Sequence, residues 1–337
     1  MARTVVYTDP AWLVTDGALQ RSGFELVEQP LLTDVELVTG PFADGRYQLT
    51  GPELLSAVNG AEVIVIYRAQ VTPELLDAAG PNLRAVIRQG VGTDNLAADL
   101  LAERGIISYH VPDYCVDEVA THTSALALAL ERGLLIQHRT LTGGRFDIYA
   151  GGAPRRVSVR TLGIVGFGRI GRAVARKLGV QYGRTLVFDP YLGRDLAEGY
   201  GAHSVDSLAE LLAESDLVTL HCPLDEETTG MFGAAEFRAM KNDAYLVNAA
   251  RGKLIQPAAL AQALADDELA GVALDVFVPE NPHDDPVWKP VLADPRVVLT
   301  SHRAFLSIDA EQSSRRRVAE LVRDVLAGTP STIGRLS

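Results

Sequence analysis

Residues 161–178, TLGIVGFGRIGRAVARKL, carry the pattern that decides the fold. An apolar run leads into Gly166, Gly168 and Gly171, spaced as G-x-G-x-x-G, and apolar residues at helical intervals follow. Such a strand–turn–helix unit presents free backbone N–H groups and the positive end of the helix dipole to a pyrophosphate. The next apolar run, TLVF, ends before Asp189, where an acid would bind ribose hydroxyls. We interpret the stretch as a dinucleotide-binding unit rather than as a glycine-rich turn without a ligand.

The same acid indicates which dinucleotide binds. A carboxylate at Asp189 repels a 2′-phosphate, so NAD (NADH) is favoured over NADP. Arg184 and Arg194 are near it in the sequence and would attract that phosphate, which leaves the preference to be tested. The two cysteines, Cys115 and Cys222, are far apart and lack a metal-ligand spacing, so we expect neither a disulfide nor a metal cofactor.

Length, composition and charge limit the classes of protein that the chain could be. The 337 residues favour two domains, and 47% hydrophobic with 22% charged residues is typical of a globular protein with an ample core. The net charge of −12 argues against nucleic acid or an anionic membrane as the main partner, although a few arginines could still bind a small anion. The N-terminus has no signal-peptide pattern, and the most apolar helical segment is interrupted by Glu131 and Arg132. We therefore expect a cytoplasmic protein.

Short apolar runs alternate with helical stretches along most of the chain, which predicts an α/β fold. Crossover helices indicate parallel sheets, and the continuous apolar character of the runs indicates that helices cover both faces. A long helix over about 116–140 separates two blocks. The last apolar stripe, with Val318 and Val322, needs a partner surface and is expected to return to the first block. We predict two doubly wound parallel-sheet domains, one of residues 1–112 and 303–337 and one of residues 113–302.

Three charged residues each follow a strand of the second block. Arg251 comes after AYLVN, Glu280 after GVALDVF, and His302 after VVLTS. The carboxyl ends of parallel strands meet at one edge of a doubly wound sheet, where ligands bind. A guanidinium there can hold a carboxylate in bidentate fashion, and a carboxylate beside an imidazole fixes its tautomer and favours its protonated form. We interpret His302 as a proton donor, although each residue taken singly is more commonly a solvated surface side chain.

Seven segments resemble, in order, the D-isomer-specific 2-hydroxyacid dehydrogenases over essentially the whole chain. They are QGVGTDNLAADLLAERGI, VPDYCVDEVATH, TLGIVGFGRIGRAVARKL, LHCPLDEETTGMF, LVNAARGKLI, GVALDVFVPENP and TSHRAFLS. The histidine segment is most similar to the D-lactate dehydrogenase branch, and VPDYCVDEVATH to the phosphoglycerate dehydrogenase and C-terminal-binding-protein branches. The resemblance implies a Rossmann-type nucleotide domain inserted into a flavodoxin-like substrate domain, in a homodimer that interconverts a 2-keto acid and a D-2-hydroxy acid with NAD(H).

The resemblance also implies roles for individual residues. Arg251 would bind the keto acid, His302 would exchange the proton, and Glu280 would support His302. The residues implied at the cofactor are Gly166, Gly168, Arg169, Ile170, Gly171, Asp189, His221, Cys222, Pro223, Thr228, Ala249, Ala250, Asp275 and His302. Those implied at the substrate are Tyr67, Arg68, Gly90, Val91, Gly92, Arg251, His302 and Arg303.

Additional arginines indicate a substrate with a second anionic group, such as a distal carboxylate, phosphate or phosphonate. Arg68 follows the strand VIVIY, Arg88 precedes the loop GVG, and Arg303 follows the histidine. The alternative is that these arginines face solvent or pair with acids. His122 is expected to pack or hydrogen-bond within the long helix and is not assigned to the site.

Two other functions share this scaffold. An NADH-sensing, corepressor-like binding protein would bind the cofactor with little turnover. A dehydrogenase of the formate or phosphite type would oxidise a small anion directly. The intact set of Arg251, Glu280 and His302 favours an enzyme that acts on 2-keto or 2-hydroxy acids.

Overall fold

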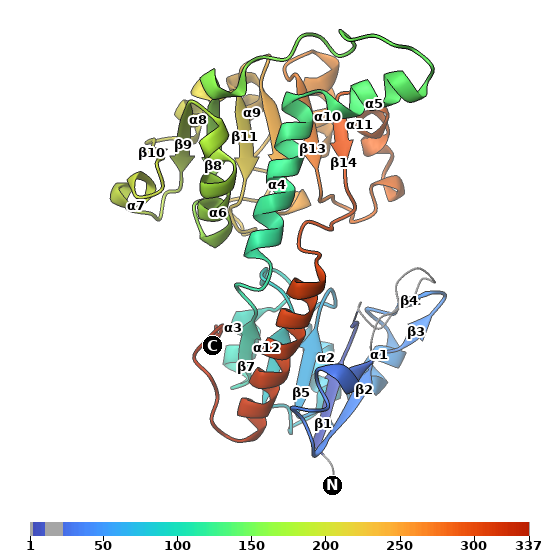
Figure 1. The fold of residues 1–337 in the computed structure, drawn as a ribbon. Coiled ribbons are helices and arrows are strands. Elements are labelled where there is room, and N and C mark those ends of the chain that lie inside the picture. Colours follow the sequence, from blue (N-terminus) through green and yellow to red (C-terminus); the bar gives the residue numbers. More distant parts are fainter. Residues whose placement is uncertain (1–2, 11–22, 337) are drawn as a thin grey trace. The chain divides into compact units, whose positions relative to one another are not determined.

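A computed structural model describes residues 3–10 and 23–336 of the chain. They form two compact units (Figure 1). Unit 1 comprises residues 1–114 and 307–337, and unit 2 comprises residues 115–306. The expected domains were 1–112 with 303–337 and 113–302, so each boundary lies a few residues further along the chain.

Unit 2 is built on a parallel sheet of seven strands in the order β10-β9-β8-β11-β12-β13-β14. The order reverses between β8 and β11, and this switch point is where doubly wound sheets bind ligands. The strands are β8 (Thr161–Val165), β9 (Arg184–Phe188), β10 (His203–Ser204), β11 (Leu217–Leu220), β12 (Tyr245–Asn248), β13 (Gly271–Leu274) and β14 (Val297–Leu299).

Helices cover both faces of this sheet, and each face has its own buried core. One core contains Ala120 and Val174 from α4 and α6, and the other contains Leu212, Phe237 and Leu260 from α8, α9 and α10. The helices are α4 (Val116–Glu131), α5 (Leu134–Thr142), α6 (Arg169–Lys177), α7 (Arg194–Glu198), α8 (Leu208–Glu214), α9 (Ala234–Ala239), α10 (Pro257–Ala265) and α11 (Lys289–Ala293).

The helix expected over about 116–140 is in fact two helices. Gly133 lies between α4 and α5 with φ 59°, in the left-handed region that glycine adopts at little cost. A residue in this conformation ends an α-helix. The expectation of a single helix was therefore wrong, because the apolar spacing continues across the break.

Unit 1 has a parallel sheet of five strands in the order β2-β1-β5-β6-β7, which is the flavodoxin-like arrangement. With the sheet of unit 2, it confirms the predicted parallel α/β fold class. The strands of this sheet are β1 (Arg3–Tyr7), β2 (Val35–Thr39), β5 (Val63–Ile66), β6 (Ala85–Arg88) and β7 (Ile107–His110). The short antiparallel pair is β3 (Phe42–Ala43) with β4 (Arg46–Tyr47), and the helices are α1 (Pro52–Ala57), α2 (Pro73–Ala79), α3 (Ala98–Glu103) and α12 (Ile308–Leu326).

The C-terminal helix α12 packs on the sheet of unit 1. Its stripe, including Val318 and Val322, shares a buried core with Val5 and Val63 of the sheet strands. Ser307 begins the helix, and its hydroxyl accepts a hydrogen bond from Ala310 N–H at 2.9 Å. None of the helices in the described ranges is both long and apolar enough to cross a membrane.

Candidate active site

The glycine turn after β8 is shaped by close backbone contacts. Gly166 has φ 87°, and a Cβ atom added there would lie 2.5 Å from the backbone nitrogen of Cys222. A Cβ on Gly171 would lie 2.2 Å from the carbonyl oxygen of Gly166. At Gly168, the N-cap of α6, an added Cβ would meet nothing within 4 Å. The turn therefore brings unobstructed backbone to the N-terminus of a nine-residue helix, as a pyrophosphate requires. Arg169 and Ile170 begin this helix.

Asp189 follows β9 and is bonded to the glycine turn. One carboxylate oxygen accepts from Phe167 N–H at 2.8 Å, and the other accepts from Tyr191 N–H at 3.0 Å. Arg184 lies at the amino end of β9, whereas Asp189 follows its carboxyl end. The side chain of Arg184 pairs with Glu214. It cannot attract a phosphate bound near Asp189, because the whole strand separates the two residues. The opposing signal expected from Arg184 was therefore wrong.

The loop after β11 lies against the glycine turn. His221 N–H donates to the carbonyl of Val165 at 2.7 Å, and its Nε2 lies 2.9 Å from Thr219 Oγ1. Burial lowers the pKa of His221 to about 3, so the imidazole is neutral at neutral pH. Burial raises the pKa of Cys222 to about 11, so its thiol also stays uncharged. Neither group therefore suits proton transfer or nucleophilic attack at neutral pH.

The same loop is closed by a hydrogen-bonded turn. Thr228 Oγ1 donates to the carbonyl of Pro223 at 2.8 Å, and Thr228 N–H donates to Asp225 Oδ1 at 2.9 Å. These bonds fix the path of the loop from Pro223 to Thr228 beside the turn after β8.

Arg251 lies after β12 in a loop held by a buried asparagine. Asn248 donates from Nδ2 to the carbonyl of Arg251 at 2.9 Å and accepts at Oδ1 from Ala250 N–H at 3.0 Å. The loop therefore has a fixed shape, with Ala249 and Ala250 at its start. Gly252 permits it to pass the backbone of Phe277, where a Cβ would lie 2.2 Å from the carbonyl carbon. Sequence reasoning missed Asn248, whose only signal is a polar residue that ends an apolar run.

Glu280 and His302 form a direct pair. Glu280 Oε1 lies 2.6 Å from His302 Nδ1, and the two residues follow β13 and β14. The segment before Glu280 is anchored by Trp288, which is 1% exposed and donates from Nε1 to the carbonyl of Val278 at 2.9 Å. Because β12, β13 and β14 are adjacent parallel strands, Arg251, Glu280 and His302 lie at the same edge of the sheet.

Asp275 follows β13 and is fully buried. Its carboxylate accepts from Thr300 Oγ1 at 2.6 Å, from Arg303 N–H at 3.0 Å and from Ala304 N–H at 2.9 Å. Burial alone would raise the pKa of Asp275, but its hydrogen bonds outweigh burial, and the pKa lies below its ordinary value. The carboxylate thus holds the loop that carries His302. Its contact with the cofactor stays a prediction.

Unit 1 gathers a second group of expected residues at the carboxyl ends of its strands. Tyr67 and Arg68 follow β5, and Gly90, Val91 and Gly92 follow β6. Asp9, which is 1% exposed, accepts from Tyr67 N–H at 3.0 Å and from Arg68 N–H at 2.6 Å. Sequence reasoning missed Asp9, because a single acid after the first strand carries no specific pattern.

Arg88 is bound within its own unit. Its guanidinium donates to Asn95 Oδ1 at 3.2 Å and to the carbonyl of Gln89, and it lies 5.2 Å from the centroid of the Tyr67 ring. Asn95 in turn donates to the carbonyl of Tyr67 at 3.2 Å. Arg88 therefore fixes the neighbouring loops through an amide and a carbonyl, and a contact between Arg88 and the substrate stays a prediction. Arg68 differs, because its side chain is 49% exposed with Asp9 at 3.7 Å.

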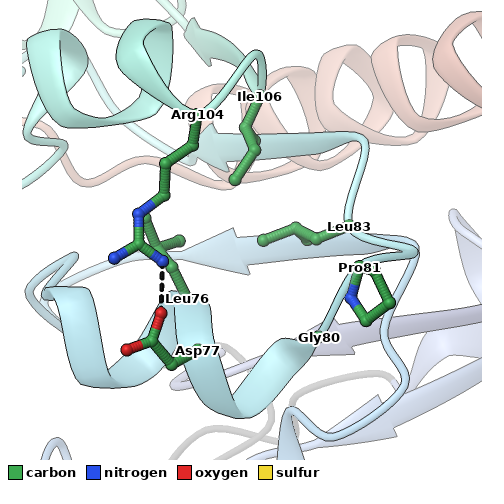
Figure 2. A pocket seen from close by; sticks show the side chains of 7 residues that line it. All are labelled: Leu76, Asp77, Gly80, Pro81, Leu83, Arg104 and Ile106. Carbon is green, nitrogen blue, oxygen red and sulfur yellow. Dashed lines mark hydrogen bonds and ion pairs between the residues drawn. The ribbon is translucent and has the colours of Figure 1, made fainter.

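A cavity of about 390 Å³ in unit 1 lies away from these residues. Figure 2 shows that Arg104 and Asp77 form an ion pair across it, next to the apolar side chains of Leu76, Leu83 and Ile106. Leu83 and Ile106 precede β6 and β7, so the cavity lies at the amino ends of these strands. Within the described ranges, no group of three His, Cys, Asp or Glu side chains has the arrangement of a metal site.

Comparison with known proteins places the chain among dehydrogenases. The sequence model described as D-isomer specific 2-hydroxyacid dehydrogenase, NAD binding domain, matches residues 124–304. D-3-phosphoglycerate dehydrogenase of Methanocaldococcus jannaschii is 33% identical over 94% of this chain and 57% of that protein. Glyoxylate reductase of Korarchaeum cryptofilum is 37% identical over 76% of this chain and 75% of that protein. The chain spans a little over half the length of the phosphoglycerate dehydrogenases that it matches.

The fold has close counterparts among solved structures. The crystal structure of D-lactate dehydrogenase from Aquifex aeolicus, complexed with NAD and lactic acid, superposes with a TM-score of 0.83. The two chains are 27% identical, and the similarity covers 96% of each.

Proposed function

Because the chain belongs to the D-isomer-specific 2-hydroxyacid dehydrogenase family, we propose that it is an NAD-dependent oxidoreductase that interconverts a 2-keto acid and a D-2-hydroxy acid. Bound NAD(H) supplies or accepts the hydride. The glycine turn, α6 and Asp189 would hold it, since the turn offers open backbone at Gly168 and a carboxylate beside it. The observation that carries the proposal is the Glu280–His302 pair, at 2.6 Å, which follows β13 and β14, the two strands next in the sheet after the β12 strand that precedes Arg251.

His302 would exchange the proton with the substrate oxygen. Its Nδ1 is engaged by Glu280, so Nε2 is the nitrogen available for this exchange. In its protonated state the imidazole would donate the proton on Nε2 to the alkoxide that develops at C2 during reduction. In the oxidation direction, the neutral imidazole would accept the proton from the hydroxyl group.

Arg251 would orient the substrate by its carboxylate. A guanidinium binds a carboxylate through two parallel hydrogen bonds and holds it in one orientation. The loop held by Asn248 restricts the positions that the arginine can adopt. Backbone N–H groups of Val91 and Gly92, together with Tyr67, would contribute further contacts to the substrate, whereas the N–H of Gly90 already donates to the carbonyl of Arg88 at 2.8 Å.

A second anionic group on the substrate would be bound by Arg68 or Arg303. Both side chains are exposed, and Asp9 fixes the backbone of Arg68 through its N–H group. Arg68→Ala and Arg303→Ala should each be assayed with monoanionic and dianionic keto acids, with the exposed Arg46 on β4 as the matched control, Arg46→Ala. If a variant loses activity equally on monoanionic and dianionic keto acids, that arginine does not bind the second anionic group.

We also propose NAD in preference to NADP and a homodimer. The preference rests on Asp189; Arg184 lies at the amino end of β9, away from it, and the effect of Arg194, at the start of α7, stays to be measured with NADPH. The dimer rests on exposed apolar side chains that follow α4 in the sequence: Leu134, Leu141, Phe146, Ile148, Tyr149 and Val159, which are 54% to 85% exposed. Phe146→Asp should shift the mass measured by light scattering toward the monomer, whereas Val180→Asp, at a residue 74% exposed elsewhere in unit 2, should not. A cytoplasmic location stays a prediction.

The direct test is NADH oxidation across a panel of 2-keto acids. The panel pairs monoanions such as pyruvate and glyoxylate with phosphorylated, phosphonate and dicarboxylate analogues, each assayed with NADPH in parallel. Turnover of at least one 2-keto acid that is lost in His302→Gln supports the proposal. Tight NADH binding without turnover of any acid would refute it and would support an NADH-sensing binding protein instead.

A further inference from the structure

A hydrogen-bonded chain leads from α4 to the loop that carries His302. His122 lies on α4, and its Nε2 is 3.0 Å from Thr300 Oγ1 and 3.5 Å from Asp275 Oδ1. Thr300 Oγ1 is 2.6 Å from the same Asp275 oxygen. The first helix of unit 2 and its last segment therefore meet at one buried carboxylate.

The proton positions in this chain follow from the chemistry of its members. The lowered pKa of Asp275 keeps its carboxylate ionised at neutral pH, so it can only accept hydrogen bonds. The single hydroxyl proton of Thr300 must therefore point at Asp275. Its oxygen must then accept from His122, which requires a proton on His122 Nε2. The hydrogen bonds are therefore all donated in one direction, from His122 to Thr300 and from Thr300 to Asp275.

Asp275 transmits this arrangement to the backbone of three consecutive residues. His302 N–H donates to the Asp275 carbonyl at 2.7 Å, and the N–H groups of Arg303 and Ala304 donate to its carboxylate. His302 has φ 49°, a left-handed conformation that a non-glycine residue adopts only when its surroundings enforce it. The bonds to Asp275 hold the backbone on both sides of this conformation, at His302 N–H and at the N–H groups of Arg303 and Ala304.

We propose that His122 and Thr300 are positioning residues, which act through Asp275 to fix the backbone of His302 and hence the orientation of its imidazole. The part of this proposal that concerns turnover rests on the proposed function. The part that concerns the loop does not. The Asp275 carboxylate sets the direction in which the Thr300 hydroxyl donates, and the bond from His122 to the Thr300 oxygen holds that hydroxyl in place.

The test uses matched variants of the full-length chain. Thr300→Val removes the hydroxyl with little change of shape, and Thr300→Ser retains it. His122→Leu removes the donor, and His122→Gln can place an amide N–H near the position of Nε2. The control is Thr123→Val, because Thr123 is fully buried on the same helix and its hydroxyl has no hydrogen-bond partner among the described residues.

Two measurements distinguish a positioning role from a general loss of stability. The first is amide hydrogen exchange at Arg303 and Ala304, which should be about tenfold faster in Thr300→Val and His122→Leu. Thr300→Val loses the hydrogen bond to the charged Asp275 carboxylate, and His122→Leu loses the bond that holds the Thr300 hydroxyl. The second is the kinetics of keto acid reduction, where kcat should fall about tenfold while KM changes much less. Thr300→Ser, His122→Gln and Thr123→Val should resemble the wild type in both.

Each outcome decides the proposal. Unchanged exchange at Arg303 and Ala304 in Thr300→Val and His122→Leu would overturn it, and so would a Thr300→Ser variant as impaired as Thr300→Val. If Thr300→Val does not fold, the pair His122→Leu and His122→Gln gives the same comparison. If the wild type reduces no keto acid, the proposed function fails, and the exchange measurement still decides whether the loop is held in this way.

Discussion

Replacing Asp275 by asparagine removes one acceptor from the most heavily bonded buried group of the candidate site. Asn keeps one oxygen, which can still accept from Thr300 and Arg303, but its amide nitrogen then faces the N–H of Ala304. Two donors face each other where a charge-assisted hydrogen bond existed. Because Asp275 is fully buried, water cannot take the place of the lost acceptor.

The expected loss in the free energy of unfolding is about 2–3 kcal/mol. A hydrogen bond to a charged group contributes about 1.5–3 kcal/mol, and a buried donor left unpaired costs a similar amount. The relief of the desolvation of the charged carboxylate offsets part of this sum. With a urea m-value of about 2–3 kcal/mol/M, the unfolding midpoint of unit 2 should fall by about 1 M.

Urea unfolding followed by the fluorescence of Trp288 measures this loss within unit 2. A Trp12→Phe background leaves Trp288 as the only tryptophan of the chain. Asp243→Asn is the matched control, because Asp243 is 54% exposed and pairs with an exposed arginine, so its change should stay within about 0.5 kcal/mol. A midpoint shift for Asp275→Asn no larger than that of the control would refute the reasoning.

The effect of Asp275→Asn should also depend on pH in a defined direction. The pKa of Asp275 is lower in the folded protein than its ordinary value of 3.8, so the ionised carboxylate stabilises the fold above that value. This contribution is lost as the pH falls below 3.8 toward the folded pKa. The difference in stability between wild type and variant should therefore be constant near neutral pH and shrink in acid.

Three further predictions concern catalysis, cofactor preference and thiol reactivity. Glu280→Gln should lower kcat by about a hundredfold, because the carboxylate that holds His302 for proton exchange is lost. NADH affinity and stability should change little, because the Glu280–His302 pair is partly exposed. An unchanged kcat would exclude the role assigned to Glu280. Asp189→Asn should raise kcat/KM for NADPH relative to NADH by about tenfold, and an unchanged ratio would remove the basis for the NAD preference. Cys222 should react with iodoacetamide at pH 8 about a hundredfold more slowly than an ordinary thiol, because its pKa of about 11 leaves little thiolate; rapid labelling in peptide mass spectrometry would contradict this.

The fold class could be predicted from local patterns, because strand periodicity, helix spacing and the glycine turn are all encoded within short segments. The predicted alternation of strands and helices is confirmed in both units. Helix boundaries were harder to predict from the sequence, because the break at Gly133 depends on a single backbone conformation within a continuous apolar pattern. Glu131 interrupts the apolar pattern of that segment, yet it is 2% exposed and lies 3.2 Å from Arg160, a partner distant in sequence.

The charged residues of the candidate site could be proposed from strand ends, but the residues that hold them could not. Asp9, Asn248 and Thr300 are ordinary polar residues in sequence. Asp9 and Asn248 act on backbone groups, and Thr300 on the Asp275 carboxylate, all brought near by the fold. His122 contacts a threonine 178 positions away. Such partners are set by tertiary structure, so no spacing rule within one segment identifies them.

The most direct test of the assignment is to reduce the best 2-keto acid with NADH that carries deuterium at both C4 positions and to analyse the product, with the wild type and His302→Gln compared side by side. The account predicts a 2-hydroxy acid of D configuration with deuterium at C2, formed at a rate lowered by about a hundredfold or more in the variant. Formation of the L enantiomer, no transfer of deuterium to any keto acid, or an unaffected His302→Gln variant would contradict it.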